Sequence, residues 1–432
     1  MMMETRAAAP LALAPRFLQH LREAGGGAIA DLLLRAANSE DEELVAALAS
    51  TAYERCWEKL HCGSWKDVLP VWREAFGRAS VLQARCLLRR QQSAECLRML
   101  DMCLMMAGPL APPETLALLA SVEVELAQDK QQEPSFKQNG ARRFKRPRLE
   151  DNCSLRLGGE VKEQTLAFPV RRLEIPTLEE FRRDVMLQNE PVIITGAMEF
   201  WPALGRAAGS ERAWKDVKYL RRVAGLRTVP VEVGSSYLGD DWGQELMTLN
   251  AFLDRHILSP LARDKKSADS KDAQPTSPKR LGYLAQHRLF DQIPVLGRDI
   301  MTPDYCTVQR VEDVDDVEDE DITINSWFGP GGTVSPLHFD PKDNVLCQVV
   351  GTKYLRLYAP KESEKLYPIE GLLSNTSQVQ VEDPDDEQFP EFRSAKYVEC
   401  VLREGEMLYI PPKYWHYVKS LSTSFSVSFW WS

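Results

Sequence analysis

The first 128 residues carry a hydrophobic pattern with the period of an α-helix. Apolar residues recur at intervals of three and four in segments such as FLQHLREA, DEELVAALASTAYERCWEKL and WKDVLPVWREAFGRASVLQARCLLRR, which is typical of amphipathic helices. Asp41 directly precedes one of these segments and is a candidate N-cap. The pattern predicts five or six helices packed as an all-α bundle over residues 1–128, although no fixed repeat period recurs. The stretch Cys86–Leu104 is so apolar that we expect it to be buried or to cover a protein partner.

A different pattern begins near residue 321. Short β-type segments are separated by turn signals that contain Gly and Pro: DITINSWF, TVSPLHF, NVLCQVV, KYLRLY, EMLYI, WHYV and SFSVSFWW. Short, evenly spaced strands indicate an all-β barrel or jelly roll rather than a βαβ fold. The sequence therefore predicts an α+β multidomain protein, with an N-terminal helical bundle and a C-terminal double-stranded β-helix within residues 165–432.

Polar segments separate and interrupt these parts. Residues 129–164 are polar and lack periodicity, which predicts a disordered linker. Its basic cluster ARRFKRPR resembles a nuclear import signal, with a solvated charge run as the alternative. A second polar stretch, at about residues 260–280, predicts a flexible insert in the barrel. The acidic run EDVDDVEDED at 312–321 is either a solvated loop or a surface that steers basic peptides towards the barrel.

Composition narrows the possible partners and the compartment. The formal net charge of −10 speaks against tight binding to the DNA backbone, which requires clustered Lys and Arg, so we expect no sequence-specific nucleic-acid binding. No apolar run approaches the length of a membrane span. The 9 cysteines are scattered and form no CxxC pair, which favours reduced thiols in the cytosol or the nucleus.

The candidate chemistry lies in three residues of the predicted barrel. His338 and Asp340 form an H-x-D motif, and His416 follows in the run IPPKYWHYV. Side chains alternate along a strand, so His338 and Asp340 are expected to face the same side while Phe339 faces the opposite layer. Two imidazoles and one carboxylate are the facial triad of non-haem Fe(II) oxygenases, which leaves coordination positions open for a cosubstrate and O₂.

Lys353 is the candidate anion-binding residue. In GTKYLRLY, Lys353 shares a strand face with Leu355 and Leu357 and is expected to point inward. A buried ammonium requires an anion, and the distal carboxylate of 2-oxoglutarate fits that requirement. Ser335 and Asn344 flank the H-x-D motif and are expected to donate or accept hydrogen bonds to the same ligand. The alternative is that Lys353 reaches solvent at the barrel rim.

These motifs resemble the JmjC-type Fe(II)/2-oxoglutarate oxygenases. The resemblance is carried by HFD, Lys353 and YIPPKYWHYV, together with GYLAQHRLFDQIP, ITINSWFGPGGTVSPLHFDP and SFSVSFWWS, and it covers roughly residues 165–432. It implies a JmjC barrel that uses Fe(II), 2-oxoglutarate and O₂. It also implies the iron ligands His338, Asp340 and His416, and cosubstrate contacts from Tyr283, Ser335, Asn344, Lys353 and Trp430. Chromatin, transcription, cell-cycle, circadian and nuclear roles come with the resemblance alone.

The run RTVPVEVGSSY gives one indication of the substrate. Strand alternation places Val229, Val231 and Val233 on one, buried face and Glu232 on the other. A lone carboxylate in an apolar strand either faces water at a sheet edge, which the neighbouring proline favours, or pairs with a cation. In the second case, a substrate arginine would be held by Glu232 together with Tyr237, Trp242, Gln286 and Ser335.

Three functions remain open from the sequence. The resemblance implies arginine C3-hydroxylation and, as another activity, demethylation of dimethyl-lysine on histone H3. A methyl-ammonium is usually held by an aromatic cage, whereas a buried carboxylate suits a guanidinium, so we rank the arginyl hydroxylase first and the demethylase second. The third possibility is a non-catalytic chromatin adaptor that acts through the helical domain.

Overall fold

The computed structural model describes residues 11–63, 67–132, 165–207, 209–234, 242–258, 280–310 and 321–432. The chain divides into two compact units. One unit comprises residues 1–148 and 226–228, and the other comprises residues 149–225 and 229–432. Most of the predicted linker, the predicted insert and nearly all of the acidic run lie outside the described residues.

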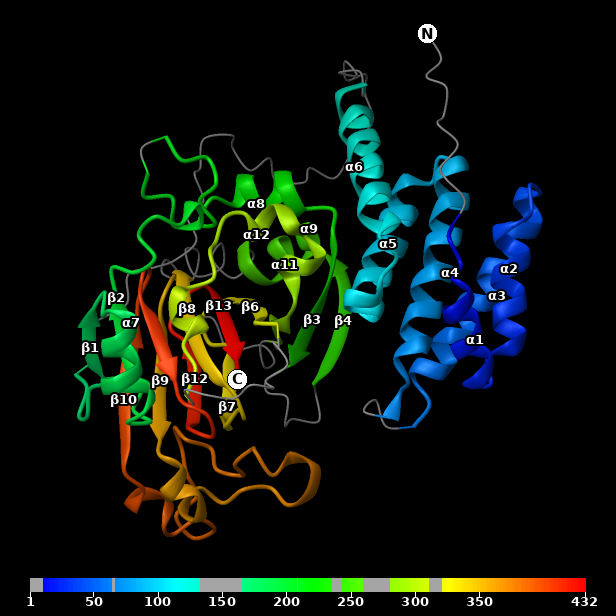
Figure 1. The fold of residues 1–432 in the computed structure, drawn as a ribbon. Helices are drawn as coiled ribbons and strands as arrows, with labels where there is room; N and C mark the ends of the chain where they lie inside the picture. Colours follow the sequence, from blue (N-terminus) through cyan, green and yellow to red (C-terminus); the bar gives the residue numbers. More distant parts are fainter. Residues whose placement is uncertain are drawn as a thin grey trace, which may run out of the picture. The chain divides into compact units, whose positions relative to one another are not determined.

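Six α-helices make up the described part of the N-terminal unit (Figure 1). Asp41 caps the third helix, where its carboxylate accepts hydrogen bonds from the backbone N–H groups of Glu43 and Leu44. The last helix continues beyond the predicted boundary at 128 because its polar end, QDKQQ, contains good helix formers although it has no apolar period. The helices are α1 (Pro15–Glu23), α2 (Gly27–Ala37), α3 (Glu42–Leu60), α4 (Pro70–Arg89), α5 (Ser93–Ala107) and α6 (Glu114–Gln132).

The core of this unit is built from the predicted apolar faces. Phe76 of α4 is fully buried, as are Cys96, Leu100 and Cys103 of α5. The apolar stretch that begins at Cys86 therefore contributes mainly to the bundle's own core. None of the described helices combines the length and apolar character needed to cross a membrane.

The second unit contains two β-sheets. The larger has the strand order β1-β2-β11-β8-β13-β6-β5-β3-β4, and the smaller has the order β10-β9-β12-β7. Neighbouring strands in the barrel are antiparallel, whereas β1 and β2 are parallel. The strands are β1 (Arg171–Glu174), β2 (Val192–Thr195), β3 (Thr228–Gly234), β4 (Gly243–Thr248), β5 (Leu281–His287), β6 (Thr323–Gly329), β7 (Val334–His338), β8 (Asp343–Val350), β9 (Lys353–Tyr358), β10 (Tyr397–Leu402), β11 (Met407–Ile410), β12 (Trp415–Ser420) and β13 (Ser424–Trp431).

Short helices cover the outer face of the larger sheet (Figure 1). Leu220, Phe252 and Leu289 from these helices share one buried cluster with Phe425 and Phe429 of β13. The helices of this unit are α7 (Leu178–Phe181), α8 (Val217–Ala224), α9 (Leu249–Phe252), α11 (Leu289–Gln292) and α12 (Pro294–Gly297), with short 3₁₀ and π turns between elements.

The central strand of the larger sheet, β13, presents polar side chains on its inner face. Along β13 the phenylalanines face the helices, so the alternating serines face the space between the two sheets. Ser426 donates a hydrogen bond to Gln348 of β8 (2.7 Å), and Ser428 lines a cavity. The serine face of β13 therefore supplies polar groups to the space between the two sheets.

The outer face of the smaller sheet is covered by the segment 360–395. Leu366, Phe389 and Phe392 of this segment cluster with Tyr354 of β9 and Trp415 of β12. The two sheets thus face each other with both outer surfaces covered, which is the arrangement predicted for a double-stranded β-helix.

Candidate metal and cosubstrate site

The three predicted metal ligands converge at one end of the barrel. One ligand atom from each of His338, Asp340 and His416 lies within 4.8 Å of the other two. The two histidines are direct neighbours on the antiparallel strands β7 and β12, with ring centroids 4.3 Å apart. The carboxylate Oδ2 of Asp340 is 3.6 Å from Nε2 of His416. In the described part of the chain, no other group of three such residues meets this geometric condition.

Both imidazoles are oriented for metal binding. Nδ1 of His338 lies 2.7 Å from the carbonyl oxygen of Pro336, and Nδ1 of His416 lies 2.9 Å from that of Tyr414. A carbonyl oxygen only accepts, so each Nδ1 carries the proton and each Nε2 presents its lone pair. Burial and, to a smaller extent, the nearby His338 lower the pKa of His416 to about 4, although Asp340 and the carbonyl of Tyr414 oppose the shift. His416 is therefore neutral at pH 7, and a donor set of two imidazoles and one carboxylate fits Fe(II).

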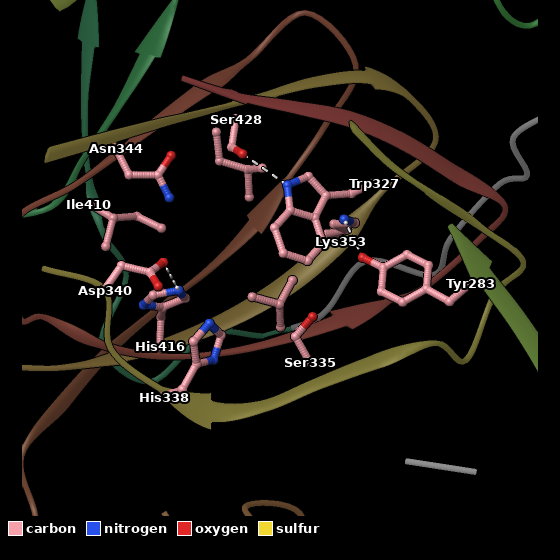
Figure 2. A pocket seen from close by; sticks show the side chains of 12 residues that line it. Tyr283, Trp327, Ser335, His338, Asp340, Asn344, Lys353, Ile410, His416 and Ser428 are labelled. Atoms are coloured by element: carbon pink, nitrogen blue, oxygen red, sulfur yellow. Dashed lines mark hydrogen bonds and ion pairs between the residues drawn. The ribbon is translucent and has the colours of Figure 1, made fainter. Parts of the chain in front are cut away.

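Asp340 lies in a turn after β7, whereas the sequence predicted that it lies on the same strand as His338. Strand β7 ends at His338, because the next residue pairs with a loop instead of a neighbouring strand. The backbone N–H of Phe339 donates to the carbonyl of Asn375 (2.9 Å), and the carbonyl of Asp340 accepts from the N–H of Lys413 (2.7 Å). The two ligands of the H-x-D motif nevertheless reach the same cavity (Figure 2).

A cavity extends from the triad into the barrel. Its walls come from both sheets, and Asp340 is the only carboxylate among them (Figure 2). The lining residues are Tyr283, Trp327, Ser335, His338, Asp340, Asn344, Leu346, Lys353, Ile410, His416, Val418 and Ser428. The structure thus brings four of the five predicted cosubstrate residues together with all three predicted metal ligands.

Lys353 lies inside this cavity and has no carboxylate partner there. Its side chain is 2% exposed, and its Nζ is 3.3 Å from the hydroxyl of Tyr283. Burial lowers the pKa of Lys353 to about 7. An inward lysine beside a neutral hydroxyl is costly unless an anion binds, so the position fits a ligand carboxylate and contradicts the alternative of a solvent-exposed rim lysine.

Tyr283 is fixed beside Lys353 by close packing. A Cβ on Gly329 would lie 2.7 Å from Cδ2 of Tyr283, so only glycine leaves room for the ring at that position. Burial raises the pKa of the Tyr283 hydroxyl, and the charge of Glu232 adds to the rise while a hydrogen bond with Ser335 opposes it. Tyr283 therefore stays protonated and is able to donate to an anion next to Lys353.

Trp430 is the predicted cosubstrate residue that does not line the cavity. It lies opposite Asn344 in the pairing of β13 with β8, two positions beyond Ser428. Among the described residues, its indole Nε1 and Oδ1 of Asn344 have no hydrogen-bonding partner although both atoms are buried. Buried polar atoms without partners are rare, and this pair indicates that a polar group belongs at this end of the cavity.

Sequence reasoning missed Trp327 and the apolar part of the cavity wall. Trp327 lines the cavity and donates through Nε1 to the hydroxyl of Ser428 (2.9 Å). In the run INSWF this tryptophan has the pattern of a core aromatic residue, and only the pairing of Trp327 with Ser426 places it on the inner face. The other missed lining residues are Leu346, Ile410, Val418 and Ser428.

The structure brings two of the predicted substrate residues, Glu232 and Trp242, into contact. Glu232 is half-buried opposite Tyr283 in the pairing of β3 with β5, and it accepts a hydrogen bond from the indole of Trp242. The edge-strand alternative for Glu232 is wrong, because β4 lies outside β3 in the sheet. Gln286 is exposed, with a positive φ of 45° at an irregularity in the pairing of β5 with β6. That irregularity turns Gln286 away from the cavity, and Tyr237 lies outside the described residues.

Two protein families match this chain. Residues 178–432 match the family described as a cupin-like domain. Residues 11–136 match the family described as KDM8-like, N-terminal ARM repeats. The family match identifies ARM repeats in the helical part, whose period is not visible in the sequence alone.

Similar proteins are known from animals and plants. The chain is 41% identical to lysine-specific demethylase 8 of Danio rerio, with 90% of this chain and 87% of the relative covered. It is 40% identical to lysine-specific demethylase JMJ30 of Arabidopsis thaliana, with 96% and 91% covered. It is 34% identical to Jumonji C domain-containing protein 5 of Drosophila melanogaster, with 92% and 90% covered.

The His-Asp-His site lies in the matched cupin-like domain, and the similarity extends over nearly the whole chain, including the helical repeats. The protein therefore belongs to the JmjC cupin-like family, together with lysine-specific demethylase 8, and is a 2-oxoglutarate-dependent dioxygenase of that family.

Proposed function

We propose that this protein hydroxylates C3 of arginine residues in basic segments of nuclear proteins. The observation that carries the proposal is Glu232. Burial raises the pKa of its carboxyl group, whereas the hydrogen bond from Trp242 lowers it. Among the described residues, no basic side chain pairs with Glu232. A cation of the substrate would stabilise the carboxylate, and a guanidinium matches it with two parallel hydrogen bonds.

A substrate cation bound to Glu232 would lie near the cosubstrate cavity. Glu232 does not line that cavity, but it faces Tyr283 across the β3–β5 pair, and Tyr283 lines the cavity wall. A guanidinium bound to Glu232 would therefore lie next to the tyrosine that contacts Lys353. The aliphatic part of the same side chain would be directed towards the metal site.

The chain's own residues have distinct tasks in this reaction. Fe(II) and 2-oxoglutarate, when bound, supply the activation of O₂ that places one oxygen atom on a substrate carbon. His338, Asp340 and His416 would hold the metal. Lys353 and Tyr283 would bind the distal carboxylate of the cosubstrate, and the apolar side chains Leu346, Ile410 and Val418 would exclude water around it.

Demethylation of methyl-lysine is the second candidate. Relatives from fish and plants bear the name lysine-specific demethylase, and the same metal site would serve a reaction on an N-methyl group. Trp242 is 41% exposed and offers an aromatic face to a methyl-ammonium. We rank this function second because a methylated ammonium cannot form the paired hydrogen bonds that a carboxylate makes with a guanidinium.

We further propose that the helical repeats bind a protein partner and that the protein acts in the nucleus. Helical repeat arrays present extended surfaces for binding. The basic cluster at residues 142–148 has the composition of an import signal.

Glu232→Gln tests the proposed substrate. The variant keeps the shape of the side chain and removes its charge, and Glu245→Gln on the exposed face of β4 is a matched control. Arginine and dimethyl-lysine peptides are incubated with each protein, and mass spectrometry records a gain of one oxygen or a loss of one methyl group.

We expect Glu232→Gln to lose at least about tenfold in arginine hydroxylation, because charge-assisted hydrogen bonds are about twice as strong as neutral ones. Cosubstrate turnover without peptide should persist in the variant. Equal arginine hydroxylation by wild type and Glu232→Gln would remove Glu232 from the site, and methyl-lysine turnover unaffected by the substitution would favour the demethylase.

A further inference from the structure

The segment Asn375–Ser377 runs beside the turn that carries the ligand Asp340. The N–H of Ser377 donates to the carbonyl of Leu337 (2.8 Å), and the N–H of Phe339 donates to the carbonyl of Asn375 (2.9 Å). In addition, the side-chain Nδ2 of Asn375 donates to the carbonyl of Phe339 (3.0 Å). Asn375 therefore satisfies both backbone polar groups of the residue that separates the two ligands of the H-x-D motif.

The carbonyl of Phe339 is important because it belongs to the peptide unit that leads into Asp340. Rotation of that peptide plane changes the direction in which the Asp340 carboxylate points. Strand β7 ends at His338, so no ladder of strand hydrogen bonds restrains the plane. On the far side, the carbonyl of Asp340 accepts from the N–H of Lys413 (2.7 Å). Only the bond from the Asn375 amide comes from a side chain, so a substitution removes it without changing the backbone.

We infer that Asn375 is a positioning residue of the metal site, which holds Asp340 where its carboxylate meets the two imidazoles. The inference rests on the proposed role of His338, Asp340 and His416 as metal ligands. Asn375 lies outside the metal-binding cavity and acts through the peptide of Phe339. Groups that orient metal ligands in this way typically change metal affinity by about 10–100-fold when they are removed.

The test is the binding of Co(II) alone to the metal-free, full-length protein, measured by calorimetry in the absence of cosubstrate. Asn375→Ala removes the amide. Asn375→Asp keeps its size but places an oxygen opposite the carbonyl of Phe339. Gln378→Ala is the matched control, because Gln378 lies in the same segment and its Nε2 donates to another backbone carbonyl, that of Pro368 (3.1 Å).

We expect both Asn375 variants to bind Co(II) about 10–100-fold more weakly than wild type, and Gln378→Ala to bind it as wild type does. Excess Fe(II) should restore the kcat of the Asn375 variants, since positioning affects occupancy of the site. The melting temperature of each metal-free variant shows whether it folds. If Asn375→Ala unfolds, Asn375→Asp alone decides the matter.

Asp340→Ala, measured in the same experiment, tests the metal site separately from the role of Asn375. Equal Co(II) binding by wild type and Asp340→Ala would refute the proposed metal site itself. Weaker binding by Asp340→Ala, together with wild-type binding by the folded Asn375 variants, would leave the metal site in place and overturn the role of Asn375.

Discussion

Phe339 and Trp415 pack edge to face, with ring centroids 4.8 Å apart and ring planes 76° from parallel. Each is a direct chain neighbour of a metal ligand: Phe339 lies between His338 and Asp340, and Trp415 precedes His416. Trp415 is buried, and its Nε1 donates to the hydroxyl of Ser363 (2.8 Å). The aromatic layer on the outside of the smaller sheet therefore joins the two segments whose next residues point into the cavity.

Replacement of Trp415 by Ala should lower both stability and metal affinity. Removing a fully buried tryptophan costs about 3–5 kcal/mol in the free energy of unfolding, and it frees the segment that precedes His416. Trp415→Phe keeps a ring against Phe339 and should lose less. Urea unfolding of the metal-free proteins measures the effect. A loss below about 1 kcal/mol for Trp415→Ala would show that the aromatic contact does not support this part of the barrel.

Replacement of either His338 or Asp340 by Ala should abolish cosubstrate turnover while the domain stays folded. Both side chains are only partly buried, and neither belongs to the apolar clusters of the barrel. Succinate production with added Fe(II) measures turnover, and circular dichroism checks the fold. Because Ni(II), Co(II) and Zn(II) also bind such donor sets, the protein must first be freed of metal. Undiminished succinate production by either variant would contradict the assignment of the triad.

The sequence predicts the parts of the site that are visible in short motifs or in local periodicity. The H-x-D motif and His416 are recognised by residue type, and the inward face of Lys353 follows from strand alternation. Asp340 reaches the cavity from a turn after β7 and not from the strand itself. The errors arise where pairing between strands departs from regularity. The irregularity near Gln286 turns that side chain outward. For Glu232 the sequence left two alternatives open, and strand β4 beyond β3 excludes the sheet edge. Trp327 was missed because its neighbours across the sheet, not its own segment, decide which face it occupies.

Lys413 provides a test of the turn that holds Asp340. Lys413 has a φ of 61°, in the left-handed region that disfavours residues with a Cβ, and its side chain is exposed. Lys413→Gly accepts this φ and keeps the N–H that donates to Asp340, so stability should stay within about 1 kcal/mol of wild type. Lys413→Pro loses the N–H and requires a φ near −65°, so it should strongly weaken Co(II) binding. Similar Co(II) affinities for both variants would show that the Lys413–Asp340 bond does not orient the carboxylate.

The lowered pKa of Lys353 predicts how cosubstrate affinity depends on pH. In the folded, ligand-free protein, burial lowers the pKa of Lys353 to about 7 from the 10.5 of an exposed lysine. The unfolded chain therefore binds more protons between these two values, and the stability of the ligand-free protein should rise with pH across that range. A dicarboxylate requires the ammonium form, so its binding must be accompanied by proton uptake above pH 7.

The affinity of the metal-loaded protein for 2-oxoglutarate should therefore fall roughly tenfold between pH 7 and pH 8.5, as the fraction of protonated Lys353 declines. The pKa of His416 lies well below this interval and that of Tyr283 is raised above it, so neither group titrates there. Calorimetry with Mn(II) under anaerobic conditions measures the affinity. Lys353→Arg keeps its charge throughout and should remove the pH dependence, whereas Lys353→Ala should weaken binding by about 2–5 kcal/mol at pH 7, the usual effect of truncating one partner of a buried charge pair. An affinity that is independent of pH in wild type, or unchanged in Lys353→Ala, would mean that the distal carboxylate is held by other residues.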